Sequence, residues 1–352
     1  GSEMCIRDSF ISDRLTFENN IFKLSKVSIV LKKSSMKYNS FIISLFILLN
    51  FLFSGCSKSD NIGSINISNL ESVLGVAESE VPFEGDYLFF KDVSYGVKER
   101  NQLDILLPKN DQILGTVIFF HGGAFLFGTK EDLYEGETQD IILSLLEQKI
   151  AVINSEYTFI NDSDSQGVIT SLEDGAAVID FISNSTGPLN LPQNKLILAG
   201  VSAGAGIAQW NGFRETSNSQ VKGVFASIAQ SSYDLYQWEQ LFPDFSLDEL
   251  RLTYSELEDL FVKFYNGTPT KEKSELLDYR SQIDADDPPL YIYNPVYEDV
   301  IIGEDDSIDF NVLFHSYKHA DFLRKKAIEV GLEFSGAYQE SPLEFIKRVL
   351  EK

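Results

Sequence analysis

The chain has 352 residues, 43% apolar and 23% charged, which is the composition of a globular protein and excludes a disordered or collagen-like chain. Two cysteines and three histidines exclude a disulfide-built scaffold and leave little room for a zinc site, so no metal and no cofactor are expected. The formal net charge of −24 disfavours nucleic acid as a partner, because phosphate backbones attract basic surfaces.

The segment after Met36 has the features of a short export signal. Lys37 supplies positive charge, and the apolar run Phe41–Phe53 is too short to cross a bilayer but suits the core of a signal peptide. The Ser54-Gly55-Cys56 that follows resembles a bacterial lipobox, which implies cleavage before Cys56 and lipidation of its thiol. The alternative is a plain secretory signal in which Cys56 is incidental.

These features predict the organisation of the N-terminal part. Residues 1–35 are expected to be a non-native leader, because GSEMCIRDS looks like a translated adapter sequence. Residues 36–55 are expected to be the signal peptide, and the Ser/Asn-rich residues 56–80 a tether. The protein is therefore expected at the bacterial cell envelope, anchored to the membrane by the lipid on Cys56 and facing the periplasm or the cell surface.

From residue 81 onward, short apolar runs alternate with amphipathic segments. Strands are predicted at 89–95, 103–108, 116–120, 151–154, 195–199, 221–228, 289–293 and 332–337. Helices are predicted at 133–148, 168–184, 321–330 and 342–350. The continuous apolar run at 116–120 is typical of a strand buried on both faces. The alternation predicts an α/β fold over residues 81–352, with a mostly parallel, doubly wound sheet flanked by helices.

An insertion at residues 233–283 interrupts this alternation. It contains no predicted strand, has helical patterns at 247–250 and 257–262, and is rich in aromatic side chains. One interpretation is a mobile helical lid over the carboxyl ends of the strands, where open α/β sheets bind ligands. The other is additional helical packing with a core of its own.

The sequence Gly200-Val201-Ser202-Ala203-Gly204 has the pattern G-x-S-x-G directly after the strand predicted at 195–199. A strand, a sharp turn and a helix are the setting in which such a serine becomes a nucleophile, because small neighbours let the helix pass close to the strand. The structural alternative for Ser202 is a helix N-cap.

A second motif, His121-Gly122-Gly123, follows the strand predicted at 116–120. Two glycines there allow backbone N–H groups to turn inward and, with the N–H of Ala203, to bind the negative oxygen of a tetrahedral intermediate. A plain glycine turn is the alternative. His121 precedes the turn and is expected to be structural.

Together the HGGAF and GVSAG motifs resemble the α/β-hydrolase family, and within it the carboxylesterase/lipase branch with an HGG motif, over residues 89–352. The segment 287–294 resembles the one before the acidic member of that family's triad. The resemblance implies that Glu298 or the adjacent Asp299 is this acid, although Asn294-Pro295 replaces the usual His-Gly.

The general base departs from the family pattern, because no histidine follows the last predicted strand, near residues 338–341. His315 and His319 are the remaining candidates. Ser316 is expected to cap a helix that includes His319, which leaves His315 in a loop that could reach Ser202.

Two functions stand at this point. One is a serine hydrolase of carboxylic esters, small or polymeric. The other is an inactive hydrolase scaffold that binds a ligand or polymer at the cell surface.

Overall fold

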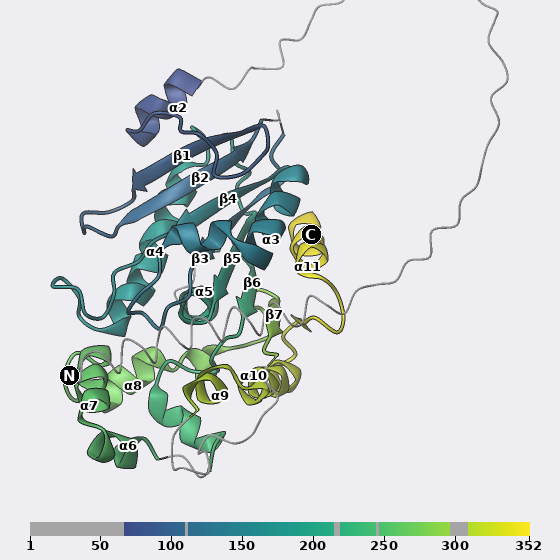
Figure 1. The fold of residues 1–352 in the computed structure, drawn as a ribbon. Helices are drawn as coiled ribbons and strands as arrows, with labels where there is room; N and C mark the ends of the chain where they lie inside the picture. Colours follow the sequence, from purple (N-terminus) through teal and green to yellow (C-terminus); the bar gives the residue numbers. More distant parts are fainter. Residues whose placement is uncertain (1–66, 110–111, 215–218, 244–245, 296–308) are drawn as a thin grey trace, which may run out of the picture. The chain divides into compact units, whose positions relative to one another are not determined.

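The computed structural model describes residues 67–109, 112–214, 219–243, 246–295 and 309–352 (Figure 1). The predicted leader, signal peptide and Cys56 lie outside these ranges. The strands are β1 (Tyr87–Ser94), β2 (Gln102–Pro108), β3 (Gly115–Phe120), β4 (Ile150–Ser155), β5 (Leu196–Val201), β6 (Val221–Ser227), β7 (Leu290–Tyr293) and β8 (Phe334–Ser335). The main helices are α2 (Ile67–Leu74), α3 (Gly136–Glu147), α4 (Val168–Ser185), α5 (Ala203–Phe213), α9 (Phe310–His315), α10 (Tyr317–Val330) and α11 (Pro342–Glu351).

The eight strands form one sheet in the order β1-β2-β4-β3-β5-β6-β7-β8. β1 and β2 pair antiparallel, as do β2 and β4, and every later pair is parallel. The parallel strands reverse their spatial order around β3, and all of them end at the same edge. This confirms the predicted α/β class and brings the residues after β3, β5, β6 and β7 to one edge of the sheet.

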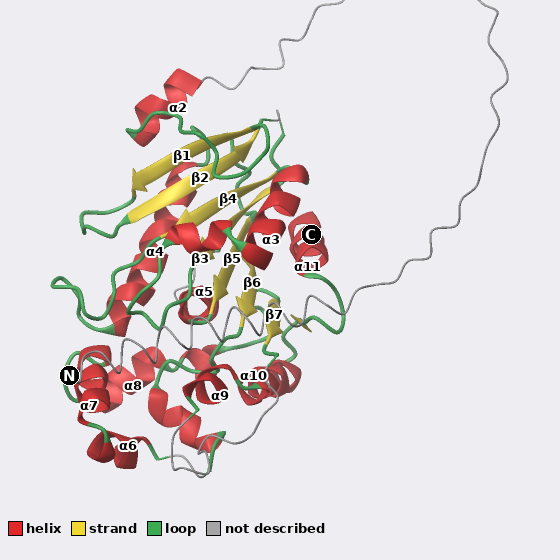
Figure 2. Ribbon diagram, viewed as in Figure 1, coloured by secondary structure: helices red, strands yellow, loops and turns green. Residues whose placement is uncertain are grey.

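Alternate side chains of the central strands enter two separate cores. Ile118 and Phe120 of β3 face the core that contains α4, α5 and α10, whereas Val117 and Phe119 face the core that contains α3 and α11. Helices thus cover both faces of the sheet (Figure 2). The buried strands have an apolar residue at nearly every position because both of their faces are covered.

Two secondary-structure elements, one near each end of the domain, differ from the prediction. Within the predicted tether, residues Ile67–Leu74 form α2, and Leu70 and Leu74 are buried in the core beside β1. The apolar i, i+4 pair explains why this stretch folds onto the domain. The strand predicted at 332–337 is only the two residues of β8.

The insertion at 233–283 forms helices, as predicted, with no strand among its described residues. They are η2 (Leu235–Gln240), α6 (Leu247–Thr253), α7 (Ser255–Phe264), α8 (Lys271–Leu277) and η3 (Tyr279–Gln282). They lie beyond the carboxyl ends of the parallel strands (Figure 1). Most of their aromatic side chains are buried in the same core as α4 and α5: Tyr233, Trp238, Phe242, Phe261, Phe264, Tyr265 and Tyr279.

The aromatic density of the insertion is therefore core packing, and this core is continuous with the main one. This continuity contradicts the expectation of a separate core, whereas the mobile lid over the carboxyl ends of the strands stays a prediction. Large apolar side chains lower their free energy by leaving water, so they pack against the domain.

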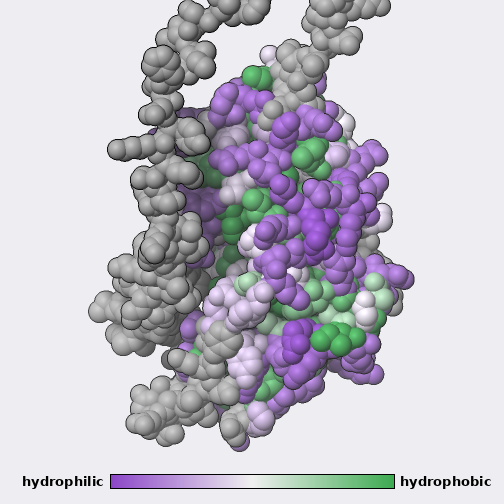
Figure 3. Space-filling model, turned by 90° about the vertical axis from the view of Figure 1, so that its right-hand side faces the viewer, coloured by the Kyte–Doolittle hydropathy of each residue, from purple (hydrophilic) through white to green (hydrophobic). Residues whose placement is uncertain are grey.

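The surface on the side of α10 and α11 is mostly hydrophilic, with apolar residues in small separate patches (Figure 3). In the described ranges, no helix combines the length and apolar character needed to cross a membrane.

Candidate active site

Ser202 lies at the sharp turn between β5 and α5. Its backbone has φ 51° and ψ −115°, a strained conformation that non-glycine residues rarely adopt. Its N–H donates to the carbonyl of Ser227 at the end of β6, over 2.9 Å. Although Ser202 is the N-cap residue of α5, its side chain makes no capping hydrogen bond. The structure thus does not support the N-cap alternative, and the hydroxyl is available for another partner.

Small residues allow this turn to be tight. A Cβ atom at Gly204 would collide with the carbonyl of Phe120, the last residue of β3. A Cβ atom at Gly200 would collide with the backbone of Gly204 itself. The two glycines of the G-x-S-x-G motif therefore let α5 start against the ends of β3 and β5.

The HGG loop passes beside this turn. A Cβ atom at Gly122 would lie 3.6 Å from Cβ of Ser202 and 3.3 Å from the carbonyl oxygen of Val201. Gly123 has φ +116°, and a Cβ there would collide with the carbonyl of Phe127. Gly123 therefore requires glycine, whereas a side chain at Gly122 would press against the Ser202 turn. Ala203, as the first residue of α5, has an N–H without an acceptor inside the helix.

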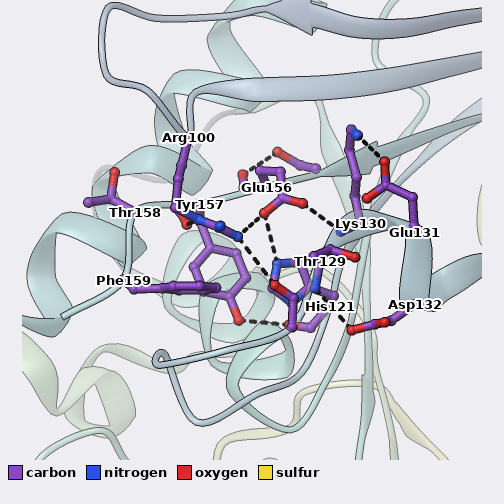
Figure 4. A network of polar contacts seen from close by, with 12 residues as sticks. Arg100, His121, Thr129, Lys130, Glu131, Asp132, Glu156, Tyr157, Thr158 and Phe159 are labelled. Atoms are coloured by element: carbon purple, nitrogen blue, oxygen red, sulfur yellow. Dashed lines mark hydrogen bonds and ion pairs between the residues drawn. The ribbon is translucent and has the colours of Figure 1, made fainter. Parts of the chain in front are cut away.

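A buried polar network supports the HGG loop from behind (Figure 4). His121 is 1% exposed, stacks on Tyr157 with ring centroids 4.4 Å apart, and places Nε2 3.4 Å from Glu156 Oε2. Glu156 also pairs with Arg100 and accepts the N–H of Lys130 at 2.7 Å. Burial raises the pKa of Glu156, but His121, the Lys130 N–H and Arg100 outweigh it and lower the pKa.

The same network reaches the backbone of the HGG loop. The hydroxyl of Tyr157 donates to the carbonyls of His121 and Gly122, at 3.0 and 3.1 Å. His121 therefore has the structural role expected from its position before the turn. Because the C=O and N–H of one trans peptide point in opposite directions, the N–H groups of Gly122 and Gly123 point away from Tyr157.

His315 lies next to Ser202, at the distance expected for a general base. Its Nε2 is 3.0 Å from the Ser202 hydroxyl oxygen, although the two residues are far apart in the sequence. His315 is the last residue of α9, so the expectation that it lies in a loop is wrong. Ser316 caps α10 as expected, because its side chain accepts the N–H of Lys318. Both Ser202 and His315 are half-buried, so a substrate can reach them.

Asn311, one helical turn before His315, contacts the other ring nitrogen. Its Oδ1 lies 3.0 Å from Nδ1 of His315. An amide oxygen only accepts hydrogen bonds, so this contact places a proton on Nδ1 and leaves the lone pair of Nε2 directed at Ser202. Burial and, to a lesser extent, His319 lower the pKa of His315 to about 4, which keeps the imidazole neutral at pH 7.

The sequence analysis did not identify Asn311. The i, i+4 spacing of Asn311 and His315 was the available signal, but it has meaning only if both residues belong to one helix. Asp309 begins that helix by accepting the N–H groups of Asn311 and Val312.

Among the described residues, no other acid or base predicted from the sequence contacts Ser202. Glu298 and Asp299 lie outside the described residues. His319 is fully buried. Its two ring nitrogens contact Ser231 and the carbonyl of Leu313, so both already have partners other than the Ser202 hydroxyl. No group of three or more His, Cys, Asp or Glu side chains in the described part of the chain is arranged to hold a metal ion.

Solved structures share this architecture. A truncated carbohydrate esterase from gut microbiota superposes with a TM-score of 0.55 at 14% identity, covering 78% of this chain and all of the other. Esterase B from Lactobacillus rhamnosis gives a TM-score of 0.50 at 18% identity, covering 72% of this chain and 75% of the other. At these identities the similarity shows the fold alone, which is the α/β-hydrolase fold.

Curated relatives match by sequence over half of the chain. The isoprenylcysteine alpha-carbonyl methylesterase ICME of Arabidopsis thaliana is 29% identical over 194 residues, which are 51% of this chain and 43% of that protein. The probable methylesterase ICMEL2 of the same plant is 28% identical over 198 residues, 51% of this chain and 44% of its own length. The chain thus spans less than half the length of these relatives.

The sequence profile of the BD-FAE family matches residues 103–311, more than half of the chain. The match runs through the HGG loop and the Ser202 turn and ends at Asn311, four residues before His315. Both motif-bearing turns therefore lie inside the matched region, on the fold that the solved esterases share. On this match the chain belongs to the BD-FAE family.

Proposed function

We propose that the protein is a serine hydrolase that cleaves carboxylic esters, with Ser202 as nucleophile and His315 as general base. The observation that carries this proposal is the 3.0 Å contact between the Ser202 hydroxyl and Nε2 of His315. The esterase names of the sequence relatives support it.

In the proposed mechanism, Nε2 of His315 takes the hydroxyl proton while the Ser202 oxygen attacks the ester carbonyl carbon. The carbonyl π electrons move to oxygen, and the N–H groups of Gly122, Gly123 and Ala203 bind this oxyanion. One such donor contributes about 10²–10³ in rate, so the loop matters as much as a side chain. The intermediate then collapses, the bond to the alcohol oxygen breaks, and the imidazolium protonates that oxygen. In the second half, Nε2 of His315 takes a proton from water as the water oxygen attacks the acyl carbon, and the imidazolium returns this proton to Ser202 as the bond between Ser202 and the acyl group breaks.

Asn311 orients the imidazole in this proposal. Ser-His-Asn differs from the usual triad in having a neutral third group, as the Cys-His-Asn site of some thiol proteases does. Glu298 and Asp299 remain proposed acids, which would act at the same ring nitrogen.

An inactive binding scaffold was the alternative, and it was motivated by the missing histidine after the last strand. His315 supplies an imidazole from α9 instead, so no observation now favours that alternative. The net charge of −24 favours uncharged over anionic esters, because the field of the protein repels anions. Small esters and ester groups on a neutral polymer both satisfy this condition.

The test compares Ser202→Ala with the parent in hydrolysis of p-nitrophenyl acetate and in labelling by a fluorophosphonate probe. Both signals should disappear in Ser202→Ala. Ser171→Ala is the matched control, because Ser171 is a buried serine of α4 that donates to the carbonyl of Thr158 at 2.6 Å. Hydrolysis by Ser202→Ala at the parent's rate would refute the proposal.

A further inference from the structure

The proposed base lies on a helix that is too short to be stable by itself. Helix α9 has six residues, and His315 is the last of them. An isolated helix of this length does not form in water. The carbonyl groups of its last turn also find no N–H donor within the helix. The position of His315 therefore depends on what holds the carboxyl end of α9.

Two side chains from outside α9 bind the carbonyls of its last turn. Nε2 of His319, in the first turn of α10, lies 2.8 Å from the carbonyl oxygen of Leu313. Nε2 of Gln230, just after β6, donates to the carbonyl of Phe314 over 2.7 Å. His319 is fully buried and Gln230 is 5% exposed, so water does not compete for either contact.

Asn294, the residue after β7, binds the next two carbonyls. Its Nδ2 donates to the carbonyls of His315 and Ser316, at 3.3 and 3.2 Å. The same side chain pairs with the backbone of Ala229, accepting its N–H at 3.1 Å and donating to its carbonyl at 2.7 Å. Asn294 is 4% exposed. The carbonyls of residues 313–316 are thus all bound by side chains.

These three side chains attach α9 to one stretch of backbone, residues 227–231, which we term the anchor segment. Asn294 pairs with Ala229, Gln230 belongs to the segment, and the N–H of Ser231 donates to Nδ1 of His319 over 3.2 Å. Ser227, at the start of the anchor segment, accepts the N–H of Ser202. The anchor segment therefore connects the backbone of the nucleophile to the helix of the base.

We propose that Asn294, Gln230 and His319 are positioning residues, which fix the distance between His315 and Ser202 by capping α9 onto the anchor segment. Their hydrogen bonds to residues 313–316 all go to backbone carbonyls, so they position His315 through the backbone. The inference rests on the proposed function. It also accounts for Asn294 standing where the family resemblance led us to expect a histidine, since its Nδ2 donates to several carbonyls while Oδ1 accepts, whereas a neutral imidazole has a single N–H to donate.

Asn294→Asp tests this inference with almost no change in side-chain volume. The carboxylate has no N–H to donate and would face the carbonyls of His315 and Ser316, so α9 should shift. We expect kcat to fall by about 10²-fold, the effect of misplacing a catalytic group by about 1 Å, with KM changed by less than about threefold. Fluorophosphonate labelling of Ser202 should slow in parallel.

Asn211→Asp is the matched control. Asn211 is a buried amide in α5 that donates to the carbonyls of Leu172 and Ile207, both over 2.9 Å, and it contacts neither α9 nor the anchor segment in these bonds. Its substitution should lower the melting temperature while the folded protein keeps its kcat. Equal kcat losses in Asn294→Asp and Asn211→Asp would overturn the inference.

Two further substitutions keep the inference testable if Asn294→Asp does not fold. His319→Gln retains an N–H that can reach the carbonyl of Leu313, whereas His319→Leu does not, so kcat should be largely kept in the first and lost in the second. Equal kcat in the two variants would contradict the capping role. If Ser202→Ala remained active, the proposed function itself would fail, which separates that outcome from failure of the positioning inference.

Discussion

The acid limb of the pH–rate profile should report His315. Burial and His319 lower the pKa of this imidazole to about 4, and in the proposed mechanism the neutral form accepts the Ser202 proton. Activity should therefore be full above pH 6 and fall only as the pH drops through 4. At pH 5, about 90% of such an imidazole is neutral, against about 3% for one with the ordinary pKa near 6.5.

Asn311→Asp should move this limb toward higher pH. The substitution places a carboxylate where Oδ1 of Asn311 now lies 3.0 Å from Nδ1 of His315, and a negative charge stabilises the imidazolium. Two charges about 4 Å apart interact by about 1 kcal/mol in water and about 4 kcal/mol near a protein surface. Because residue 311 is exposed, we expect the lower part of this range, a rise of about 1–2 pKa units.

The assay is kcat/KM for p-nitrophenyl acetate between pH 3.5 and 8, followed at the isosbestic wavelength of p-nitrophenol. With the pKa raised to about 5.5, activity at pH 5 should be about one quarter of the plateau, compared with about nine tenths in the parent. Asn184→Asp, an exposed site in α4, makes the same charge change and should leave the limb in place. A parent limb near pH 6.5, or an unmoved limb in Asn311→Asp, would refute this account of His315.

Other predictions concern the HGG loop, stability and the N-terminus. Gly123→Ala should lower kcat by about 10²–10³-fold, because its Cβ collides with the carbonyl of Phe127 and displaces the proposed oxyanion donor; parent-like kinetics would argue against that role. Glu156→Gln should reduce the unfolding free energy in urea by about 3 kcal/mol, since it removes the carboxylate charge that pairs with the mostly buried guanidinium of Arg100. Burial lowers the pKa of His319 to about 4, below its value in the unfolded chain. The free energy of unfolding should therefore be at its maximum above pH 6.5 and decline by about 3 kcal/mol as the pH falls to 4. Chemical denaturation at a series of pH values should show a weaker decline for His319→Gln. Cys56→Ala should move the protein from the membrane to the soluble fraction, or leave it uncleaved, and unchanged partition and mass would contradict lipid anchoring.

The elements that the sequence predicted well are those specified by local patterns. The strands near 116–120 and 195–199 were predicted within about two residues because both faces of the sheet are covered, which requires a continuous apolar run. The turns at Gly122 and Ser202 were predicted because close backbone approach admits only small residues, and this requirement is visible in a few consecutive letters.

The aromatic insertion at 233–283 shows a limit of composition. Aromatic side chains are equally suited to a ligand-facing lid and to a core, so their number could not distinguish the two. Burial of residues such as Trp238 and Tyr279 against the main core depends on where the sheet places its neighbours. The result is set by tertiary packing, which no local pattern encodes.

The fold class, the serine at its strained turn and the glycine loop beside it could be predicted from the sequence, since each depends on patterns of residues close together in the chain. Which histidine lies beside Ser202, and what holds it there, depends on contacts between distant parts of the chain. His315 reaches Ser202 through a helix whose carboxyl end is bound by Asn294, Gln230 and His319, contributed from three different parts of the chain. A six-residue helix is not stable by itself, so no local sequence pattern predicts it. Its position depends on these long-range hydrogen bonds.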